Sequence, residues 1–311
     1  MKRTISKVLS ALLVFTFIVQ VLPQVALANT TPLDSLVSVE GLLYGQAQEG
    51  SLLERIERIE LDIYGATQQG AVLMRIDQVQ SFLQSAEGEG GLQLRLNLAE
   101  WGFTASFTSG EPLIDRLQNL EIVLYGAPQT GNIAKRAETL MMDIWGTTKL
   151  DTKRVTLPAQ SLVRITLLKT VDSGKAQVGD LIDYRVAEDV MVDGRVVIPA
   201  GVISQAKVTE VSSAGRLGKD GRIVVDFGKI VSLDGTPVRL RVDEKATQEN
   251  KSLELAAGAS MAGIVLLGPV GLVGGYFVKG KDVKIEANTQ FYVETERATP
   301  VSGFYFRPAQ K

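Results

Sequence analysis

The sequence predicts an α+β protein of two parts: an N-terminal array of short antiparallel helices, then an antiparallel β-barrel or sandwich that carries an apolar, glycine-rich helical hairpin. Three observations support this. A phrase of about twenty residues recurs six times, short apolar runs split by Asp-Gly follow it, and 24 uncharged residues interrupt the second part. We expect a helical repeat domain at 29–150, a linker at 151–160 and a β domain at 161–311, with the hairpin at 255–278.

The N-terminus has the pattern of a secretory signal peptide. Lys2, Arg3 and Lys7 precede a mostly apolar run, and Ala26-Leu27-Ala28 forms a small-x-small cleavage site. The pattern predicts cleavage after Ala28 and an exported protein in the periplasm, in the cell envelope or outside the cell. Because the chain has no cysteine, it can form neither disulfides nor a lipid-anchored cysteine at this site.

The twenty-residue phrase aligns on one anchor position. The anchors are Gly45, Gly65, Ser85, Ala105, Gly126 and Gly146, spaced by 20, 20, 20, 21 and 20 residues. Most units have arginine ten positions before the anchor and glutamate five before, and every unit has a large apolar residue two before. Such a period is typical of packed structural repeats rather than of an enzyme core.

Each unit predicts one amphipathic helix. In the second unit, apolar residues at spacings of three and four place one face of a helix over Ser51 to Tyr64, and Gly65 stands where a left-handed C-cap residue belongs. Helices of about 20 Å joined by short loops should lie antiparallel. The arginine and glutamate of one unit are five apart and do not face each other on one helix, so we expect them to pair with neighbouring units or to point to solvent.

An aromatic residue stands directly before the anchor in four units. These residues are Tyr44, Tyr64, Tyr125 and Trp145. One interpretation is that they pack the helix ends against the next repeat. The other is an aromatic ladder that binds glycan or peptide, which makes these four the candidate interaction residues.

The composition limits the chemistry of the chain. It has no histidine and no cysteine, which excludes a Ser-His-Asp triad, a thiol nucleophile and imidazole metal ligands. We therefore expect no enzyme activity, cofactor or metal. Asp172-Ser173-Gly174 matches a short aspartic-protease motif, but a β-turn is the expected reading. Residues 29–150 hold 16 acidic and 8 basic residues and 151–311 hold 19 and 22, so no nucleic-acid partner is expected.

The second part has the signals of a compact antiparallel β domain. Strands are expected over 162–168 and 181–186, over 190–198 split by Asp193-Gly194, and over 222–242 split by Asp234-Gly235. The segments 196–202 and 283–289 both predict strand, tight turn and strand, with Gly201 and Asn288 at positive φ.

These strands and turns carry a resemblance. The run 163–171, Val178-Gly179-Asp180, the segment 184–190 and Ile198-Pro199-Ala200-Gly201 resemble a domain of uncharacterised bacterial exported proteins. More distantly, 161–293 is similar to the C-terminal β-barrel of TrbI-like subunits of conjugation and type IV secretion channels, which place an "IPxG" turn after a strand pair. Those subunits have an inner-membrane anchor and a proline-rich linker, where this chain has a cleavable signal and helical repeats.

The apolar segment 255–278 is long enough to cross a membrane, but strands flank it on both sides. A hairpin bent at Gly268-Pro269 fits better, with arms too short to span a bilayer. It either packs on the β domain or contacts a membrane or another copy of the chain through closely spaced small residues. The candidate contact residues are Gly258, Gly263, Gly268, Pro269, Gly271 and Gly275.

Together these patterns predict a non-enzymatic exported protein of the cell envelope with a structural or scaffold role. The expected partner is an envelope component, either peptidoglycan or an envelope protein, and self-association is a further expectation. The alternative is an assembly subunit of an outer-envelope channel, or of a secretion or conjugation complex, in which 255–278 inserts into lipid.

Overall fold

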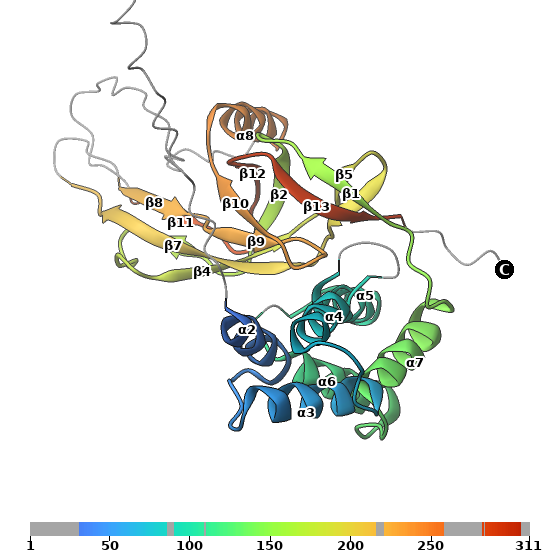
Figure 1. Ribbon diagram of the computed structural model, residues 1–311. Helices are drawn as coiled ribbons and strands as arrows, with labels where there is room; N and C mark the ends of the chain where they lie inside the picture. The colour runs from blue at the N-terminus through green and yellow to red at the C-terminus, as the bar shows by residue number, and fades with distance from the viewer. Residues whose placement is uncertain are drawn as a thin grey trace, which may run out of the picture.

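The fold consists of a helical layer and a sheet layer (Figure 1). The computed structural model describes residues 31–85, 90–108, 110–215, 221–257, 282 and 284–305. In these ranges, an N-terminal array of helices is followed by antiparallel curled sheets, so the predicted α+β fold class is confirmed. The predicted signal peptide at 1–28 and residues 258–278 of the predicted hairpin lie outside the described residues.

Each of the six repeat units forms one helix of 13 residues. The helices are α2 (Pro32–Tyr44), α3 (Leu52–Tyr64), α4 (Val72–Gln84), α5 (Leu92–Thr104), α6 (Leu113–Tyr125) and α7 (Ile133–Trp145). Thr31 and Ser51 form capping boxes at the starts of α2 and α3. Five of the six anchors adopt the left-handed conformation predicted for a C-cap, and the exception is Ser85 at the end of α4.

The helices do not form an open solenoid, in which each repeat would contact only its neighbours. Within the first three units α2 packs on α4, and within the last three α5 packs on α7. The two groups then meet through α2 with α6 and α3 with α7. At this junction Asn132, the N-cap of α7, donates a hydrogen bond from Nδ2 to the carbonyl of Tyr64 at 3.1 Å. The array is therefore a closed body of two three-helix groups.

The described β strands pair in antiparallel fashion. They are β1 (Thr152–Leu157), β2 (Leu162–Leu167), β3 (Val171–Asp172), β4 (Leu181–Val186), β5 (Val190–Val192), β6 (Arg195–Ile198), β7 (Ile203–Ser212), β8 (Arg222–Asp226), β9 (Lys229–Val231), β10 (Pro237–Arg241), β11 (Lys284–Ile285), β12 (Gln290–Thr295) and β13 (Thr299–Phe304). A seven-stranded sheet has the order β8-β7-β4-β2-β12-β10-β9, and a four-stranded sheet has the order β1-β13-β6-β5. A β3–β11 pair completes the set.

Three segments differ from the predictions. The expected linker at 151–160 contains β1, which pairs along its length with β13. This segment is a strand because β13, far away in the sequence, supplies partners for its backbone N–H and C=O groups. The expected strand pair over 222–242 is broken again at Gly228, so that β8 and β9 lie at opposite edges of one sheet. A helix that the sequence analysis missed, α8 (Glu244–Ala257), packs on β12 and takes in the first residues of the predicted hairpin.

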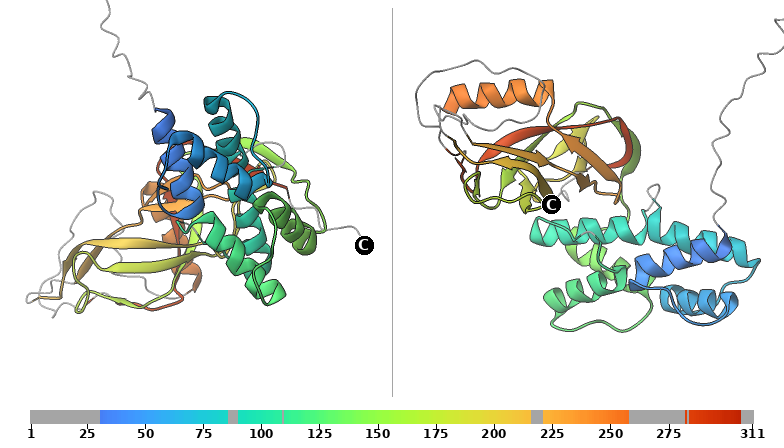
Figure 2. Two further views of the ribbon diagram at one scale, coloured as in Figure 1. Left: turned by 60° about the horizontal axis from the view of Figure 1, so that its bottom comes forward. Right: turned by 90° about the vertical axis from the view of Figure 1, so that its left-hand side faces the viewer.

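One continuous apolar core runs through both layers, from Leu36 in α2 to Phe304 in β13. Helix α5 lies between the layers, and its residues from Leu94 to Glu100 are all buried. Figure 2 shows the sheets stacked on the helical array with α5 on the side that faces them. The helical array and the β domain therefore share a core rather than being joined by a free linker.

Candidate interaction site

Buried arginine–glutamate pairs join consecutive helices of the array. Arg55 donates to both carboxylate oxygens of Glu40, from Nε at 2.9 Å and from Nη2 at 2.6 Å. Arg75 binds Glu60 in the same bidentate way at 2.8 and 2.7 Å. Glu40 and Glu60 are both 0% exposed. The Glu100–Arg116 and Glu121–Arg136 pairs repeat this geometry in the last three units. Of the two expected arrangements, these residues therefore adopt pairing between neighbouring units.

Each of these glutamates also accepts a hydrogen bond from the loop that follows its helix. The Oε2 atom accepts the backbone N–H of the residue eight positions later, at 2.9 Å in Glu40, Glu60 and Glu121 and at 2.6 Å in Glu100. One carboxylate thus holds its own loop and the arginine of the next helix. Charged groups this deeply buried need several partners, and the repeat supplies them at fixed spacing.

The ladder of pairs is interrupted between the third and fourth units. Gln80 stands in the glutamate column there, and the Nε of Arg95 donates to the carbonyl of Gly90 at 3.1 Å. The interruption coincides with the boundary between the two three-helix groups.

The fourth unit also binds the β domain, while its Glu100 pairs with Arg116 of the fifth unit. Asn97 is 1% exposed, accepts from Arg116 Nη2 at 2.6 Å and donates to the carbonyl of Leu233 at 2.6 Å. Trp101 donates its indole N–H to the carbonyl of Ala200 at 3.0 Å. Asn97 therefore connects Arg116 of the buried ladder to the carbonyl of Leu233 in the β domain.

The turn after β6 is the β-domain side of this contact. Gly201 has a φ of 93°, and a Cβ placed on it would overlap the carbonyl oxygen of Ala105 at the end of α5. The positive φ predicted for Gly201 and Asn288 is confirmed, with Asn288 at 67°. The Ile198-Pro199-Ala200-Gly201 turn thus lies against the helical array, and only a residue without a Cβ allows the close approach.

Two of the four predicted aromatic interaction residues bond to the next helix. Tyr44 donates its hydroxyl to Asp62 Oδ2 at 2.6 Å, and Tyr125 donates to Asp143 Oδ2 at 2.6 Å. Burial and then the bond to Asp143 raise the pKa of Tyr125 to about 12. The pKa of Tyr44 is raised further, by burial first and then by Asp62.

The other two aromatic residues make ring contacts. Tyr64 meets Phe82 edge to face with centroids 5.6 Å apart. Trp145 stacks on Trp101 at 6.1 Å, meets Phe304 of β13 at 6.2 Å, and donates to the carbonyl of Leu98 at 3.2 Å. All four side chains lie between helices or between layers, and Tyr125, the most exposed, is 38% exposed.

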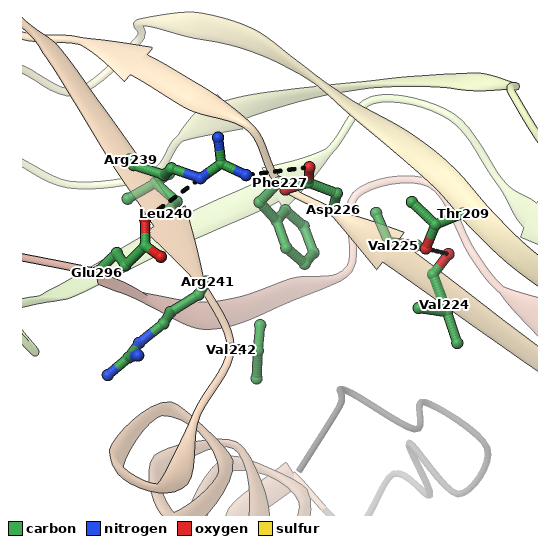
Figure 3. A pocket seen from close by; sticks show the side chains of 10 residues that line it. All are labelled: Thr209, Val224, Val225, Asp226, Phe227, Arg239, Leu240, Arg241, Val242 and Glu296. Atoms are coloured by element: carbon green, nitrogen blue, oxygen red, sulfur yellow. Dashed lines mark hydrogen bonds and ion pairs between the residues drawn. The ribbon is translucent and has the colours of Figure 1, made fainter.

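A cavity of about 250 Å³ opens beside β8 and β10. Figure 3 shows apolar Phe227 and Leu240 beside Arg239, whose guanidinium lies between Asp226 at 3.6 Å and Glu296 at 3.3 Å. These partly exposed pairs neutralise one another, so the cavity presents balanced rather than single-sign charge.

The Asp-Ser-Gly motif lies in a turn beside a second cavity, of about 380 Å³. Asp172 accepts the backbone N–H of Gly174 at 2.9 Å and its carbonyl accepts from Ala176, while Ser173 donates to Asp282 at 2.9 Å. The turn predicted at this motif is therefore confirmed. The described ranges hold no cluster of three or more acidic residues suited to a metal ion.

The candidate membrane or oligomer contacts Gly258, Gly263, Gly268, Pro269, Gly271 and Gly275 lie outside the described residues. Among the helices that the structure describes, none is long and apolar enough to cross a membrane.

No family model and no curated protein matches the chain. Among solved structures, it is similar to ComB10 of the Com type IV secretion system of Helicobacter pylori, with 12% identity over 46% of this chain and 88% of that one and a TM-score of 0.27.

Asn97 and Trp101, which join the two layers, were not predicted from the sequence. Asn97 and Trp101 stand in a helix whose apolar and polar residues show almost no segregation to one face. That lack of amphipathicity is itself the signal, because a helix that is buried all round contacts a neighbour on each side. The divergence of the fourth unit from the repeat pattern reflects its second partner.

Proposed function

We propose that this chain is a non-enzymatic exported protein of the cell envelope that works as an interaction scaffold, with the helical array as its partner-binding part. The signal-peptide pattern at 1–28 supports export. The buried arginines and glutamates of the repeats support a structural role, because their charged groups are used to hold helices and loops together.

One observation carries the interaction role. At the position twelve before the anchor, the first three units present exposed leucines: Leu33, Leu53 and Leu73 are 50%, 47% and 56% exposed. In the fourth unit the same position is Gln93, which lies against Gly235 of the β domain. The same repeat position thus contacts the β domain in the fourth unit and carries a solvent-exposed leucine in the first three units. Exposed apolar side chains of this kind are expected of a binding surface.

A pulldown tests this proposal. The mature chain, residues 29–311, would be cross-linked to envelope fractions beside a variant with Leu33, Leu53 and Leu73 all changed to serine. The expected result is capture by the native chain and at least a fivefold loss in the variant. A control with Ser38→Ala and Gln78→Ala alters exposed polar positions of α2 and α4 and should capture normally. Equal capture by all three proteins contradicts the proposal.

The alternative function is an assembly subunit of an envelope channel, in which the apolar segment enters lipid. Its support is the flanking structure: on the N-terminal side of the segment α8 packs on β12, and on its C-terminal side β11 pairs with β3. Deleting 258–278 separates the two functions. Loss of membrane fractionation or of oligomers in the deletion variant supports the channel subunit, and unchanged behaviour supports the scaffold.

A further inference from the structure

The repeat fills the space between consecutive helices with an aromatic ring in three places. Tyr44 lies between α2 and α3, Tyr64 between α3 and α4, and Tyr125 between α6 and α7. The residue opposite each ring stands three positions before the next anchor and is Asp62, Phe82 or Asp143. The charges of Glu40 and Arg58 also act on the pKa of the Tyr44 hydroxyl, which Glu40 raises and Arg58 lowers.

At the junction of α5 and α6 both partners are changed. Thr104 stands in the ring position and Val123 in the opposite position. The Thr104 hydroxyl donates to the carbonyl of Glu100 in its own helix at 2.9 Å, so it does not extend toward α6 as a tyrosine would. The ring that the repeat places here is absent.

A cavity of about 170 Å³ occupies this junction. Its lining includes Thr104, Val123, Glu100 and Asn119, which are the counterparts of Tyr44, Asp62, Glu40 and Arg58. Buried Leu120 and Phe107 form apolar lining, while Phe103 and Val123, 46% and 62% exposed, lie at the open side. We name this cavity the α5–α6 slot. It is smaller than the pockets that hold whole small molecules, but it suits one side chain.

We propose that the α5–α6 slot binds a phenylalanine side chain presented by a peptide segment of a partner protein. A ring fits the slot because the same repeat geometry holds a ring of this chain at three other junctions. Val123 favours phenylalanine over tyrosine, because Tyr44 and Tyr125 each donate their hydroxyl to an aspartate and valine stands in that position at this junction. Glu100 and Arg116 bind each other and leave no buried charge unopposed in the slot. This inference rests on the proposed scaffold function and specifies one of its contacts.

The test uses N-acetyl-phenylalaninamide and N-acetyl-tyrosinamide as probes on residues 29–311. Methyl NMR signals of Leu120 and Val123 report occupancy of the slot. For a ligand of this size we expect saturable shifts with a Kd on the order of 1 mM, and at least threefold weaker binding of the tyrosine probe.

Two variants separate the slot from general surface binding. In the first, Thr104→Tyr with Val123→Asp recreates the Tyr44–Asp62 pair and fills the slot, so binding should fall at least tenfold while the melting temperature holds or rises. In the second, Val123→Asp alone leaves the slot open and supplies an acceptor, so the preference should change to the tyrosine probe. Ile122→Asp is the matched control, because Ile122 is 45% exposed on the same helix and does not line the slot; it should bind as the native chain does.

The proposal is overturned by shifts that are absent, or that are equal in the native chain and the double variant. It is also overturned if the native chain self-associates in sedimentation and the double variant is monomeric, since the occupant is then a second copy. A negative titration with a positive envelope pulldown rejects the slot alone, whereas failure of both also rejects the scaffold function.

Discussion

At the scale of single residues, the buried carboxylates of the ladder carry the most consequence. Glu60 is fully buried, accepts two bonds from Arg75 and one from the Gln68 backbone. Removing one member of a buried ion pair leaves the other without compensation, which costs about 3–5 kcal/mol. Glu60→Gln should lower the free energy of unfolding by that amount in urea denaturation. Glu49→Gln, at an exposed position, should change it by less than about 0.5 kcal/mol, and equal effects would contradict the role of the ladder.

The same residue predicts the direction of the pH dependence. Burial alone would raise the pKa of Glu60, but the bonds from Arg75 and Gln68 outweigh it and lower the pKa below its ordinary value. A carboxyl with a lowered folded-state pKa contributes stability above its unfolded pKa of about 4.3, and that stability is lost as pH falls through the folded pKa. Melting temperatures measured from pH 7 to pH 3 should therefore fall at the acid end. The fall should be smaller in Glu60→Gln, and identical profiles would reject this assignment.

Gly201 shows how one residue without a side chain determines a contact between layers. Gly201→Ala would strain a left-handed backbone and overlap Ala105, so we expect a loss of about 3 kcal/mol or more. Gly179→Ala is the matched control, because Gly179 has a φ of 102° and open space around its Cβ position. It should lose only about 1 kcal/mol. Similar losses in both variants would show that backbone strain alone acts at Gly201.

At the scale of elements, the sequence predicted correctly those helices and strands whose ends are marked by nearby residues, such as a glycine at a helix end or a turn before a strand. Gly65, Gly126 and Gly146 end their helices in the left-handed conformation, and the segment 181–186 was predicted as the strand it forms. They failed where a distant partner decides the structure. The sequence of β1, Thr152–Leu157, was predicted as a linker because its strand conformation depends on pairing with β13, which is far away in the sequence.

Helix α5 is the element that the repeat pattern describes least well. Its buried Asn97 bonds to both Arg116 and Leu233. Asn97→Leu would leave the Leu233 carbonyl without this donor and Arg116 without this acceptor, which we expect to lower stability by about 2–4 kcal/mol. Limited proteolysis should then cleave between the layers before it cleaves within either. Unchanged cleavage would mean that apolar packing alone holds α5.

At the scale of the whole molecule, the shared core predicts cooperative unfolding. The two tryptophans of the chain, Trp101 and Trp145, both lie near the boundary between the layers. Their fluorescence reports the junction, and far-ultraviolet circular dichroism reports the helices. We expect the two thermal transitions to coincide in the native chain. A fluorescence change more than about 10 °C below the dichroism change would indicate two domains that unfold separately.

The sequence by itself determined the α+β class, the six helices, their caps, and the hairpin turns, because those features depend on periodicity and on glycine or Asp-Gly at turn positions. The repeat spacing singled out Tyr44, Tyr64, Tyr125 and Trp145 as candidate interaction residues, which stays a prediction, and the structure adds which helix or layer each one touches. Only the tertiary structure decided that the arginine and glutamate columns form a buried ladder, that α5 joins the array to the sheets, and that Thr104 and Val123 open a slot. The physical reason is that these contacts depend on the packing of helices and strands far apart in sequence, which no local pattern encodes.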